Sequence, residues 1–438
     1  MLLGTQRVNE EGHLEIGGCD AVALAREFGT PLYVMDEALI RANCRAYKRA
    51  FAERYPNNEV SYAGKAFLCT AMCALLEEEG MCLDVASAGE LHTALRAGFP
   101  PERLFLHGNN KSRLELEMAI SAGVHRIIVD NEYELEMLIA LAERAGRPVD
   151  VLFRITPGID PHTHERIRTG QVDTKFGLEV QNGQAARVIE RAVAHPFLRV
   201  RGTHFHVGSQ LLDLEAHRQA IEIGVDLLAQ FRDDIGYIAE EMNIGGGLGI
   251  RYLSHHEPPS ISEYADMVIG TLKACLQAHN LPAPKLQQEP GRSIVGEAGT
   301  TLYTVGAVKE IPGVRTYVTV DGGLSDNPRP ALYDARYEVL LANKANRPAE
   351  RLVTVAGKHC ETDTLFPDVT VPDPAPGDLL AVQSTGAYNY AMASNYNRFP
   401  HPAVVLVHDG QAEVIVERQT LDDLVSKDVL PRRFARPR

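Results

Sequence analysis

Apolar residues between positions 58 and 295 form eight short runs, and the stretches between the runs carry the periodicity of amphipathic helices. The runs are EVSYAGK, CLDVAS, LFLHGN, RIIVDN, VDVLFRI, RGTHFHVG, MNIGGG and KLQQEPGRS. The first five begin about 22 to 24 residues apart, which leaves room for one helix and two loops in each repeat. A strand followed by a helix, repeated eight times, predicts an α/β fold of the (β/α)8 TIM-like barrel type.

One of the intervening stretches, SAGELHTALRAG, carries signals for both ends of a helix. Ser87 and Glu90 have the spacing of a capping box, and Gly98 is the residue type that ends helices in a left-handed conformation. We therefore expect a helix between these limits.

The pattern changes after residue 299 to strands without long helices between them. These runs are TTLYTVGAVKEI, RTYVTVDGG, RLVTVAGK, DLLAVQST, AVVLVHDG and AEVIVE. They predict a second, all-β domain. We expect the barrel to span residues 33–298 and the β-rich domain to contain residues 1–32 and 299–438.

Charge and composition narrow the class of partner. The chain has 438 residues and a formal net charge of -14, which argues against nucleic acid or an anionic membrane and favours a small ligand. No apolar run near the N-terminus is long enough for a signal peptide or a membrane span, so we expect a cytoplasmic protein. The seven cysteines are scattered, odd in number and without a CxxC pair, which favours free thiols in a reducing compartment: Cys19, Cys44, Cys69, Cys73, Cys82, Cys275 and Cys360.

Residues at the carboxyl ends of barrel strands are the candidates for chemistry. Lys65 ends the first run, and by itself it is a salt-bridge partner more often than a reagent. His204 and His206 in the sixth run are two apart, which places both on the inward side of a strand. They could bind a metal, form a flat surface for a cofactor ring, or be hydrogen-bonded core histidines.

The last two runs end in a glycine cluster, GGGLG, and in EPGR. Gly245 to Gly249 could fold backbone N–H groups around a phosphate, although a plain tight turn is an equal alternative. Glu289 and Arg292 lie in EPGR, which in isolation could be a turn with a surface ion pair. A lysine for an aldehyde, an imidazole for a ring, a glycine turn for a phosphate and a carboxylate for a pyridine nitrogen together suit pyridoxal 5'-phosphate (PLP).

The segments YAGKAF, HFHVGSQ, NIGGGLG and EPGRSIVGEAG, in this order, resemble the fold type III PLP-dependent decarboxylases. Within that family, the motifs HERIRTGQVDTKFG, DNPRPALYDARY, GKHCET and GAYNYAMASNYNRFPHPA resemble the branch that acts on diaminopimelate. The resemblance covers nearly the whole chain. It implies PLP-dependent decarboxylation of meso-2,6-diaminopimelate to L-lysine and CO2, the last step of lysine biosynthesis.

The resemblance also implies residue roles. Lys65 would bind the cofactor covalently and Cys360 would be the catalytic acid. The remaining cofactor contacts would come from His206, Ser209, Gly246, Gly247, Glu289, Pro290, Gly291, Arg292 and Tyr388. The substrate would contact Arg292, Arg329, Tyr333, Glu361 and Tyr388. The family arrangement further implies a homodimer in which the β-rich domain supplies substrate and dimer contacts, and each partner completes the other's active site.

One motif departs from the family pattern, which commonly continues Cys-Glu-Ser-x-Asp. Here the chain runs Cys360, Glu361, Thr362, Asp363, Thr364, so the acidic residue lies one position early. The departure leaves the roles of Cys360 and Glu361 intact and makes the local geometry of the loop an open question.

Two alternatives remain at this point. The same fold could act on ornithine, arginine or lysine, although such enzymes generally have aspartate where this chain has Glu361. A metal-dependent barrel hydrolase could use His204 and His206, with His162 and His164, as ligands.

The polar segment GIDPHTHERIRTGQVDTKFG, which follows the fifth run, is a candidate lid.

Overall fold

The computed structural model describes residues 1–156, 175–180 and 182–434 of the chain. These residues form two compact units. The barrel unit contains Ile40–Arg251 and His255–Gly296, and the β unit contains Met1–Leu39, Tyr252–Ser254 and Glu297–Arg438.

The barrel unit is a closed barrel of eight parallel strands. In chain order the strands are β5 (Asn58–Ala63), β6 (Cys82–Val85), β7 (Leu104–Leu106), β8 (Arg126–Val129), β9 (Val149–Thr156), β11 (Leu198–His204), β12 (Glu241–Asn243) and β13 (Lys285–Gln288). Each strand pairs with the next, β13 pairs with β5, and β8 pairs with β9, so the ring has no open edge. All eight predicted strands are present, and the (β/α)8 prediction is confirmed. A short strand, β10 (Leu178–Glu179), pairs in parallel with the carboxyl end of β9.

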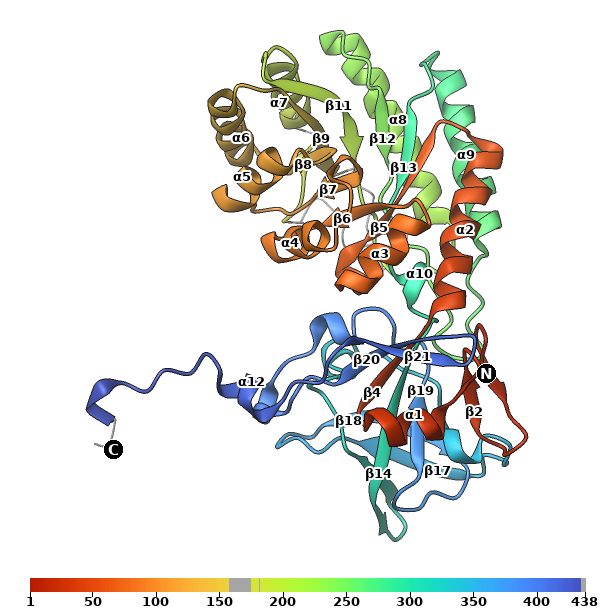
Figure 1. The fold of residues 1–438 in the computed structure, drawn as a ribbon. Helices are drawn as coiled ribbons and strands as arrows, with labels where there is room; N and C mark the ends of the chain where they lie inside the picture. Colours follow the sequence, from red (N-terminus) through yellow and green to blue (C-terminus); the bar gives the residue numbers. More distant parts are fainter. Residues whose placement is uncertain (157–174, 181, 435–438) are drawn as a thin grey trace. The chain divides into compact units, whose positions relative to one another are not determined.

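Helices surround the barrel strands (Figure 1). They are α2 (Glu37–Arg54), α3 (Thr70–Glu78), α4 (Ala88–Arg96), α5 (Arg113–Ala122), α6 (Glu132–Ala145), α7 (Gln184–Val193), α8 (Glu215–Ile235), α9 (Ile261–Ala278) and α10 (Arg292–Val295), with short 3-10 turns η1 (Gly64–Ala66) and η2 (Pro101–Arg103). Their amphipathic sequences bury one face against the strands.

The ends of α4 agree with the sequence signals except in one bond. Ser87 accepts a hydrogen bond from the backbone N–H of Glu90, and Gly98 follows the helix with φ +79°. The Glu90 carboxylate, however, accepts from the N–H of Ala86 at 2.6 Å rather than from Ser87. The prediction of a complete capping box here was therefore wrong, because the side chain reaches one residue further back.

The barrel interior has an apolar layer and a polar layer. Cys82, Phe105, Ile128 and Leu152 form a buried cluster, one residue from each of four successive strands. Side chains two positions further along a strand share the same face. That parity places a second set just above the apolar layer, at the carboxyl end of the barrel: Asp84, His107, Asp130 and Arg154. The barrel therefore presents charged groups at the end where active sites are built.

The β unit is organised around one long strand, β14 (Gly299–Ile311), which pairs with β15, β19 and β4. The other strands are β1 (Arg7–Val8), β2 (Leu14–Ile16), β3 (Cys19–Asp20), β4 (Leu32–Asp36), β15 (Arg315–Val320), β16 (Val339–Leu341), β17 (Arg351–Ala356), β18 (Thr364–Val371), β19 (Leu379–Val382), β20 (Ala403–His408) and β21 (Gln411–Val416). The N-terminal strand β4 lies between β14 and β20 and so belongs to this sheet.

Short helices and turns complete the β unit: α1 (Ala21–Phe28), α11 (Arg329–Tyr333), α12 (Leu421–Val425), η3 (Ala342–Lys344), η4 (Tyr390–Met392), η5 (Tyr396–Arg398) and η6 (Arg432–Phe434). All seven cysteines are free. Among the described residues, no helix has the length and apolar character needed to cross a membrane.

Candidate active site

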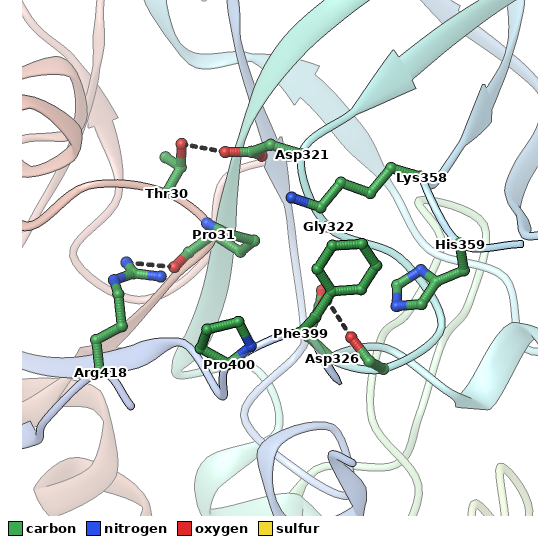
Figure 2. Close-up of a pocket in the computed structure, with 11 residues that line it drawn as sticks. Thr30, Pro31, Asp321, Gly322, Asp326, Lys358, His359, Phe399, Pro400 and Arg418 are labelled. Carbon is green, nitrogen blue, oxygen red and sulfur yellow. Dashed lines mark hydrogen bonds between the residues drawn. The ribbon is translucent and has the colours of Figure 1, made fainter. Parts of the chain in front are cut away.

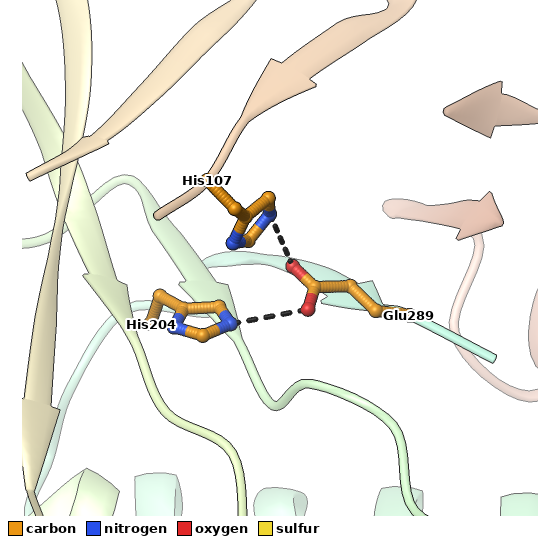
Figure 3. A group of neighbouring side chains, drawn as sticks. All are labelled: His107, His204 and Glu289. Carbon is orange, nitrogen blue, oxygen red and sulfur yellow. Dashed lines mark hydrogen bonds and ion pairs between the residues drawn. The ribbon is translucent and has the colours of Figure 1, made fainter. Parts of the chain in front are cut away.

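Glu289 lies at the centre of a polar cluster at the carboxyl end of the barrel (Figure 3). It follows β13, and its Oε1 accepts a hydrogen bond from Asn243 Nδ2 at 2.7 Å. His107 Nε2 lies 3.1 Å from Oε1, and His204 Nε2 lies 3.1 Å from Oε2. The three partners follow or end β7, β11 and β12, so the carboxylate joins four strands of the barrel.

The charges of this cluster are set by mutual contact. Burial alone would raise the pKa of Glu289, but its interactions with His107 and, after it, with His204 hold that pKa well below its usual range. Burial alone would lower the pKa of His107, but Glu289 and Asp84 raise it to about 9. Burial lowers the pKa of His204 to about 4 despite the nearby Glu289. At neutral pH the cluster therefore contains an ionised Glu289, a charged His107 and a neutral His204.

Asp84 on β6 is the second buried carboxylate of this cluster. It accepts a hydrogen bond from Ser61 on β5 and lies 3.7 Å from His107 Nε2. Burial, followed by repulsion from Glu289, raises the pKa of Asp84 to about 6. His107 thus separates two carboxylates that would otherwise repel each other.

Glu289 retains the capacity to bind one more donor. Its two carboxylate oxygens offer about four acceptor positions, and within the described part of the chain three neighbouring side chains lie against three of them. The remaining position is on Oε2. The protonated nitrogen of a pyridine ring is a donor of the kind that this ionised carboxylate would hold, so the cluster fits the PLP ring.

His206 lies beyond the end of the strand that positions His204, and it makes a hydrogen bond of its own. Strand β11 ends at His204, and the chain leaves the strand before His206. The Nδ1 atom of His206 accepts a hydrogen bond from the backbone N–H of Gly246 at 3.3 Å. Burial and the charge of Lys65 hold the pKa of His206 well below its usual range, so the ring is a neutral, flat surface.

The glycine turn after β12 has no room for side chains. A Cβ on Gly246 would lie 2.2 Å from the carbonyl oxygen of Glu289. Gly247 has φ +128°, and a Cβ there would lie 2.8 Å from the carbonyl oxygen of Gly208. The turn thus packs backbone against backbone at the end of the barrel, as an anion-binding turn requires.

The segment after Glu289 lies beside the same turn. Arg292 Nη2 donates to Ser209 Oγ at 2.9 Å, which joins the loops after β13 and β11. The carbonyl of Pro290 accepts from the N–H of Ala63 at 3.1 Å, and a Cβ on Gly291 would lie 3.0 Å from Ala63 Cβ. A hydroxyl, a guanidinium and glycine backbone therefore gather where a phosphate would bind.

Lys65 lies just beyond the end of its strand. Strand β5 ends at Ala63, and Lys65 is the central, exposed residue of η1. After burial, its charge is the next cause that lowers the pKa of His206. The prediction that Lys65 belongs to the strand itself was wrong by two residues, because the chain turns at Gly64.

The remaining predicted site residues lie in the β unit. Arg329 begins α11, is buried, and donates through Nη1 to the hydroxyls of Tyr252 and Tyr337 at 2.9 and 2.6 Å. Tyr333 ends the same short helix and is 62% exposed. Tyr388 is half-buried and has φ +62°.

Cys360 and Glu361 are both exposed in the loop between β17 and β18. The N–H of Cys360 donates to Asn397 Oδ1 at 2.9 Å, and Glu361 Oε1 accepts from the hydroxyl of Tyr396 at 2.6 Å. The short 3-10 turn η5, which contains both Tyr396 and Asn397, therefore binds the backbone of Cys360 and the side chain of Glu361.

The structure thus groups the predicted residues in two sets, one in each unit. The barrel set contains Lys65, His206, Ser209, Gly246, Gly247, Glu289, Pro290, Gly291 and Arg292, and the β-unit set contains Arg329, Tyr333, Cys360, Glu361 and Tyr388.

Sequence reasoning missed several partners that define the charges at the barrel end. His107, Asn243 and Asp84 all lay within predicted strand runs, and the first two lie at or just past the ends of the observed strands, yet none was selected. The available signal was position: a polar residue at the carboxyl end of a barrel strand is a candidate site residue.

Among the described residues, His204 and His206 do not belong to one metal-binding group. His204 and His206 have different partners, and His162 and His164 lie outside the described residues. Ligand atoms of His107, His204 and Glu289 do lie within 4.8 Å of one another. The neighbouring Glu289 and Asp84 raise the pKa of His107 to about 9, which favours its protonated form over a metal ligand.

Comparison with known proteins identifies the protein family to which the chain belongs. The model of the family described as pyridoxal-dependent decarboxylase, pyridoxal binding domain, matches residues 37–296, which include the complete barrel. The barrel set of residues and this match define a pyridoxal-dependent decarboxylase.

Full-length relatives narrow the class further. The diaminopimelate decarboxylase of Bacillus subtilis is 49% identical over 98% of each chain. The diaminopimelate decarboxylase of M. jannaschii, solved with L-lysine, is 35% identical and has a TM-score of 0.94 over 99% of this chain and 100% of that one. The lysine/ornithine decarboxylase of Vibrio vulnificus, solved with putrescine, is 25% identical, with a TM-score of 0.75 over 89% and 97%. The chain therefore belongs to the diaminopimelate decarboxylases within the pyridoxal-dependent decarboxylase family.

Proposed function

We propose that this protein uses PLP to remove CO2 from the D centre of meso-2,6-diaminopimelate and releases L-lysine. The observation that carries the proposal is the Glu289 cluster, because an ionised carboxylate with one acceptor position left suits a protonated pyridine nitrogen. The full-length relatives named diaminopimelate decarboxylase support the choice of substrate.

The barrel residues would hold the cofactor. When bound, PLP accepts the electron pair that CO2 leaves behind. Lys65 would bind its aldehyde carbon, His206 would stack on the ring, and Glu289 would keep the ring nitrogen protonated. Gly246, Gly247, Ser209 and Arg292 would bind the phosphate, with Pro290 and Gly291 shaping the turn and Tyr388 contacting the cofactor from the β-rich domain.

The β-rich domain, with the bounds 1–32 and 299–438 expected from the sequence, would bind the substrate's far end. Arg329, whose guanidinium two tyrosine hydroxyls hold, would pair with the distal carboxylate together with Arg292 and Tyr333. Glu361 would pair with the distal ammonium. Cys360 would donate its thiol proton to the carbon that has lost CO2, so that one C–C bond is replaced by one C–H bond.

We further propose that the protein is a cytoplasmic homodimer with shared active sites. Cys360 and Glu361 are exposed in the β-rich domain, while Lys65 belongs to the barrel. In a two-fold dimer each copy can supply this loop to the other's barrel.

The same fold acting on ornithine, arginine or lysine is the second candidate. These substrates have no second carboxylate and so need no cation at the position proposed for Arg329. Glu361, rather than aspartate, also favours diaminopimelate.

The test is a direct comparison of substrates. Purified protein with PLP is incubated separately with meso-diaminopimelate, L-ornithine and L-arginine, and CO2 and product are measured. We expect CO2 and lysine from diaminopimelate, and neither above background from Lys65→Ala protein. Faster CO2 release from ornithine or arginine would select the second candidate, and a colourless, PLP-free protein that hydrolyses substrates with added zinc would select a metal enzyme.

A further inference from the structure

The Glu361 carboxylate has a fixed position although it is exposed. Its Oε1 accepts a hydrogen bond at 2.6 Å from Tyr396, a residue 35 positions further along the chain. An exposed glutamate side chain samples many rotamers, and ordering it costs free energy whenever it binds a ligand. The hydrogen bond from the Tyr396 hydroxyl restricts the Glu361 side chain before the ligand binds, and so lowers the free-energy cost of ordering it.

The ring of Tyr396 packs against the ring of a buried residue, His359. It stacks on the ring of His359 with centroids 5.9 Å apart and an interplanar angle of 12°. The His359 ring also makes an edge-to-face contact with Phe399, with centroids 4.8 Å apart. His359 is buried and lines a cavity of about 190 Å³ whose wall also contains Lys358 and Phe399 (Figure 2). The buried His359 therefore packs against the exposed Tyr396 and restricts the position of its ring.

Asp363 fixes His359 in this position. One oxygen of its carboxylate accepts from the backbone N–H of His359 at 3.0 Å and from His359 Nδ1 at 2.7 Å. The other oxygen accepts from the N–H of Leu324 at 2.8 Å. Asp363 is the residue whose early position departs from the family motif, and its φ of +43° lies in the left-handed region that aspartate tolerates.

Two glycines make room for this carboxylate. A Cβ on Gly323 would lie 2.2 Å from Asp363 Oδ2, and a Cβ on Gly357 would lie 2.0 Å from the same atom. The backbone N–H of Gly357 also donates to the carbonyl of Asp363 at 2.8 Å. The loop is thus built around the aspartate at this position.

We propose that Tyr396 is a positioning residue for Glu361, and that the Asp363–His359 pair holds Tyr396 where its hydroxyl reaches that carboxylate. The inference rests on the proposed function, in which Glu361 binds the distal ammonium of the substrate. The hydrogen bond to Glu361 raises the pKa of Tyr396, so the phenol stays protonated and remains a donor.

The primary test is Tyr396→Phe, which removes one hydroxyl and keeps the ring on His359. Because Glu361 would contact a substrate ammonium that is the same before and during reaction, we expect KM for diaminopimelate to rise roughly fivefold with kcat within about twofold of wild type. Tyr133→Phe is the matched control, because Tyr133 is 73% exposed on the barrel helix α6 and should leave both constants unchanged.

A double-mutant cycle separates positioning from general structural support. In a Glu361→Gln background, adding Tyr396→Phe should change KM by less than about 1.5-fold, because the group that the phenol orients has lost its charge. A full fivefold effect in that background would overturn the proposal, since Tyr396 would then act independently of Glu361.

The outcomes also separate this inference from the proposed function. Wild-type kinetics for Glu361→Gln would overturn the ammonium-binding role of Glu361 and the positioning role of Tyr396 with it, and would leave the decarboxylase activity itself standing. Impaired Glu361→Gln with wild-type Tyr396→Phe would overturn only the positioning role.

Asp363→Asn tests whether Asp363 positions Tyr396 through His359. Its amide cannot accept from N–H groups on both sides, so we expect a KM increase like that of Tyr396→Phe, and little further increase when the two changes are combined. A lower thermal midpoint with unchanged KM would assign Asp363 to stability alone and overturn its place in the proposal.

Discussion

At the scale of single residues, the barrel end shows how neighbours set charge. Glu289 stays ionised although it is buried, because Asn243, His107 and His204 surround it. Two histidines in the same cluster have opposite shifts in pKa, since His107 lies between two carboxylates and His204 is dominated by burial. Residue type alone does not determine these states.

Lys65 gives the first prediction at this scale. Borohydride reduction of PLP-loaded protein should attach the cofactor permanently to the peptide that contains Lys65, because an amine bonded to an aldehyde carbon is reduced to a stable secondary amine. Peptide mass spectrometry locates the label. Lys65→Ala protein should carry no label, and a label on any other lysine would contradict the assignment.

His107 gives a pH prediction. Its pKa in the folded protein, about 9, is above its ordinary value of 6.5, so the stabilisation from its charged form is complete below pH 6.5 and is lost as pH rises through 9. The shift corresponds to at most about 3 kcal/mol. In cofactor-free protein, the thermal midpoint of His107→Gln should therefore be well below that of wild type at pH 6.5, and the gap should shrink by pH 9.5. A gap that is constant with pH, as expected for the exposed control His255→Gln, would contradict the ion pair.

At the scale of elements, the barrel residues assigned to the cofactor lie just beyond the ends of the strands. Strand β5 ends before Lys65, β11 ends before His206, and the glycine turn follows β12. Each strand supplies direction and burial, and the loop after it supplies the chemistry. The sequence runs located the strands but extended them into these loops, because apolar and small residues continue past the last ladder hydrogen bond.

The glycine turn gives the prediction at this scale. Gly246→Ala places a methyl group 2.2 Å from a backbone carbonyl, so the turn must shift. We expect PLP affinity to fall by at least about tenfold and the free energy of unfolding to fall by more than about 1 kcal/mol. The control is Gly270→Ala within α9, where a Cβ meets nothing within 4 Å and helix propensity predicts a gain of about 0.5–1 kcal/mol. Cofactor absorbance titrations and thermal melts measure both, and unchanged PLP affinity in Gly246→Ala would contradict the phosphate role of the turn.

At the scale of the whole molecule, the proposed chemistry is divided between two units. The barrel carries the residues assigned to the cofactor except Tyr388, while the β unit carries Tyr388, Cys360, Glu361 and Arg329. A two-fold dimer resolves this division if each copy's loop serves its partner's barrel.

Complementation tests that arrangement. Lys65→Ala and Cys360→Ala should each be inactive, yet a mixture that exchanges subunits should regain activity, because one of the two sites in a mixed dimer carries neither lesion. With equal amounts and random pairing, about half the dimers are mixed, so we expect roughly a quarter of wild-type activity. Background activity, with exchange verified by mass spectrometry of tagged subunits, would place the whole site within one chain.

The sequence by itself determined the fold class and the positions of the barrel strands, because periodicity and turn residues act locally. It also selected Lys65 and Glu289, since strand ends of a barrel converge on one rim. Only the tertiary structure joined His107, Asn243 and His204 around Glu289, and only it linked Tyr396 to the loop that contains Cys360 and Glu361. These contacts join residues far apart in the chain, and the charge of a buried group depends on such neighbours rather than on its own identity.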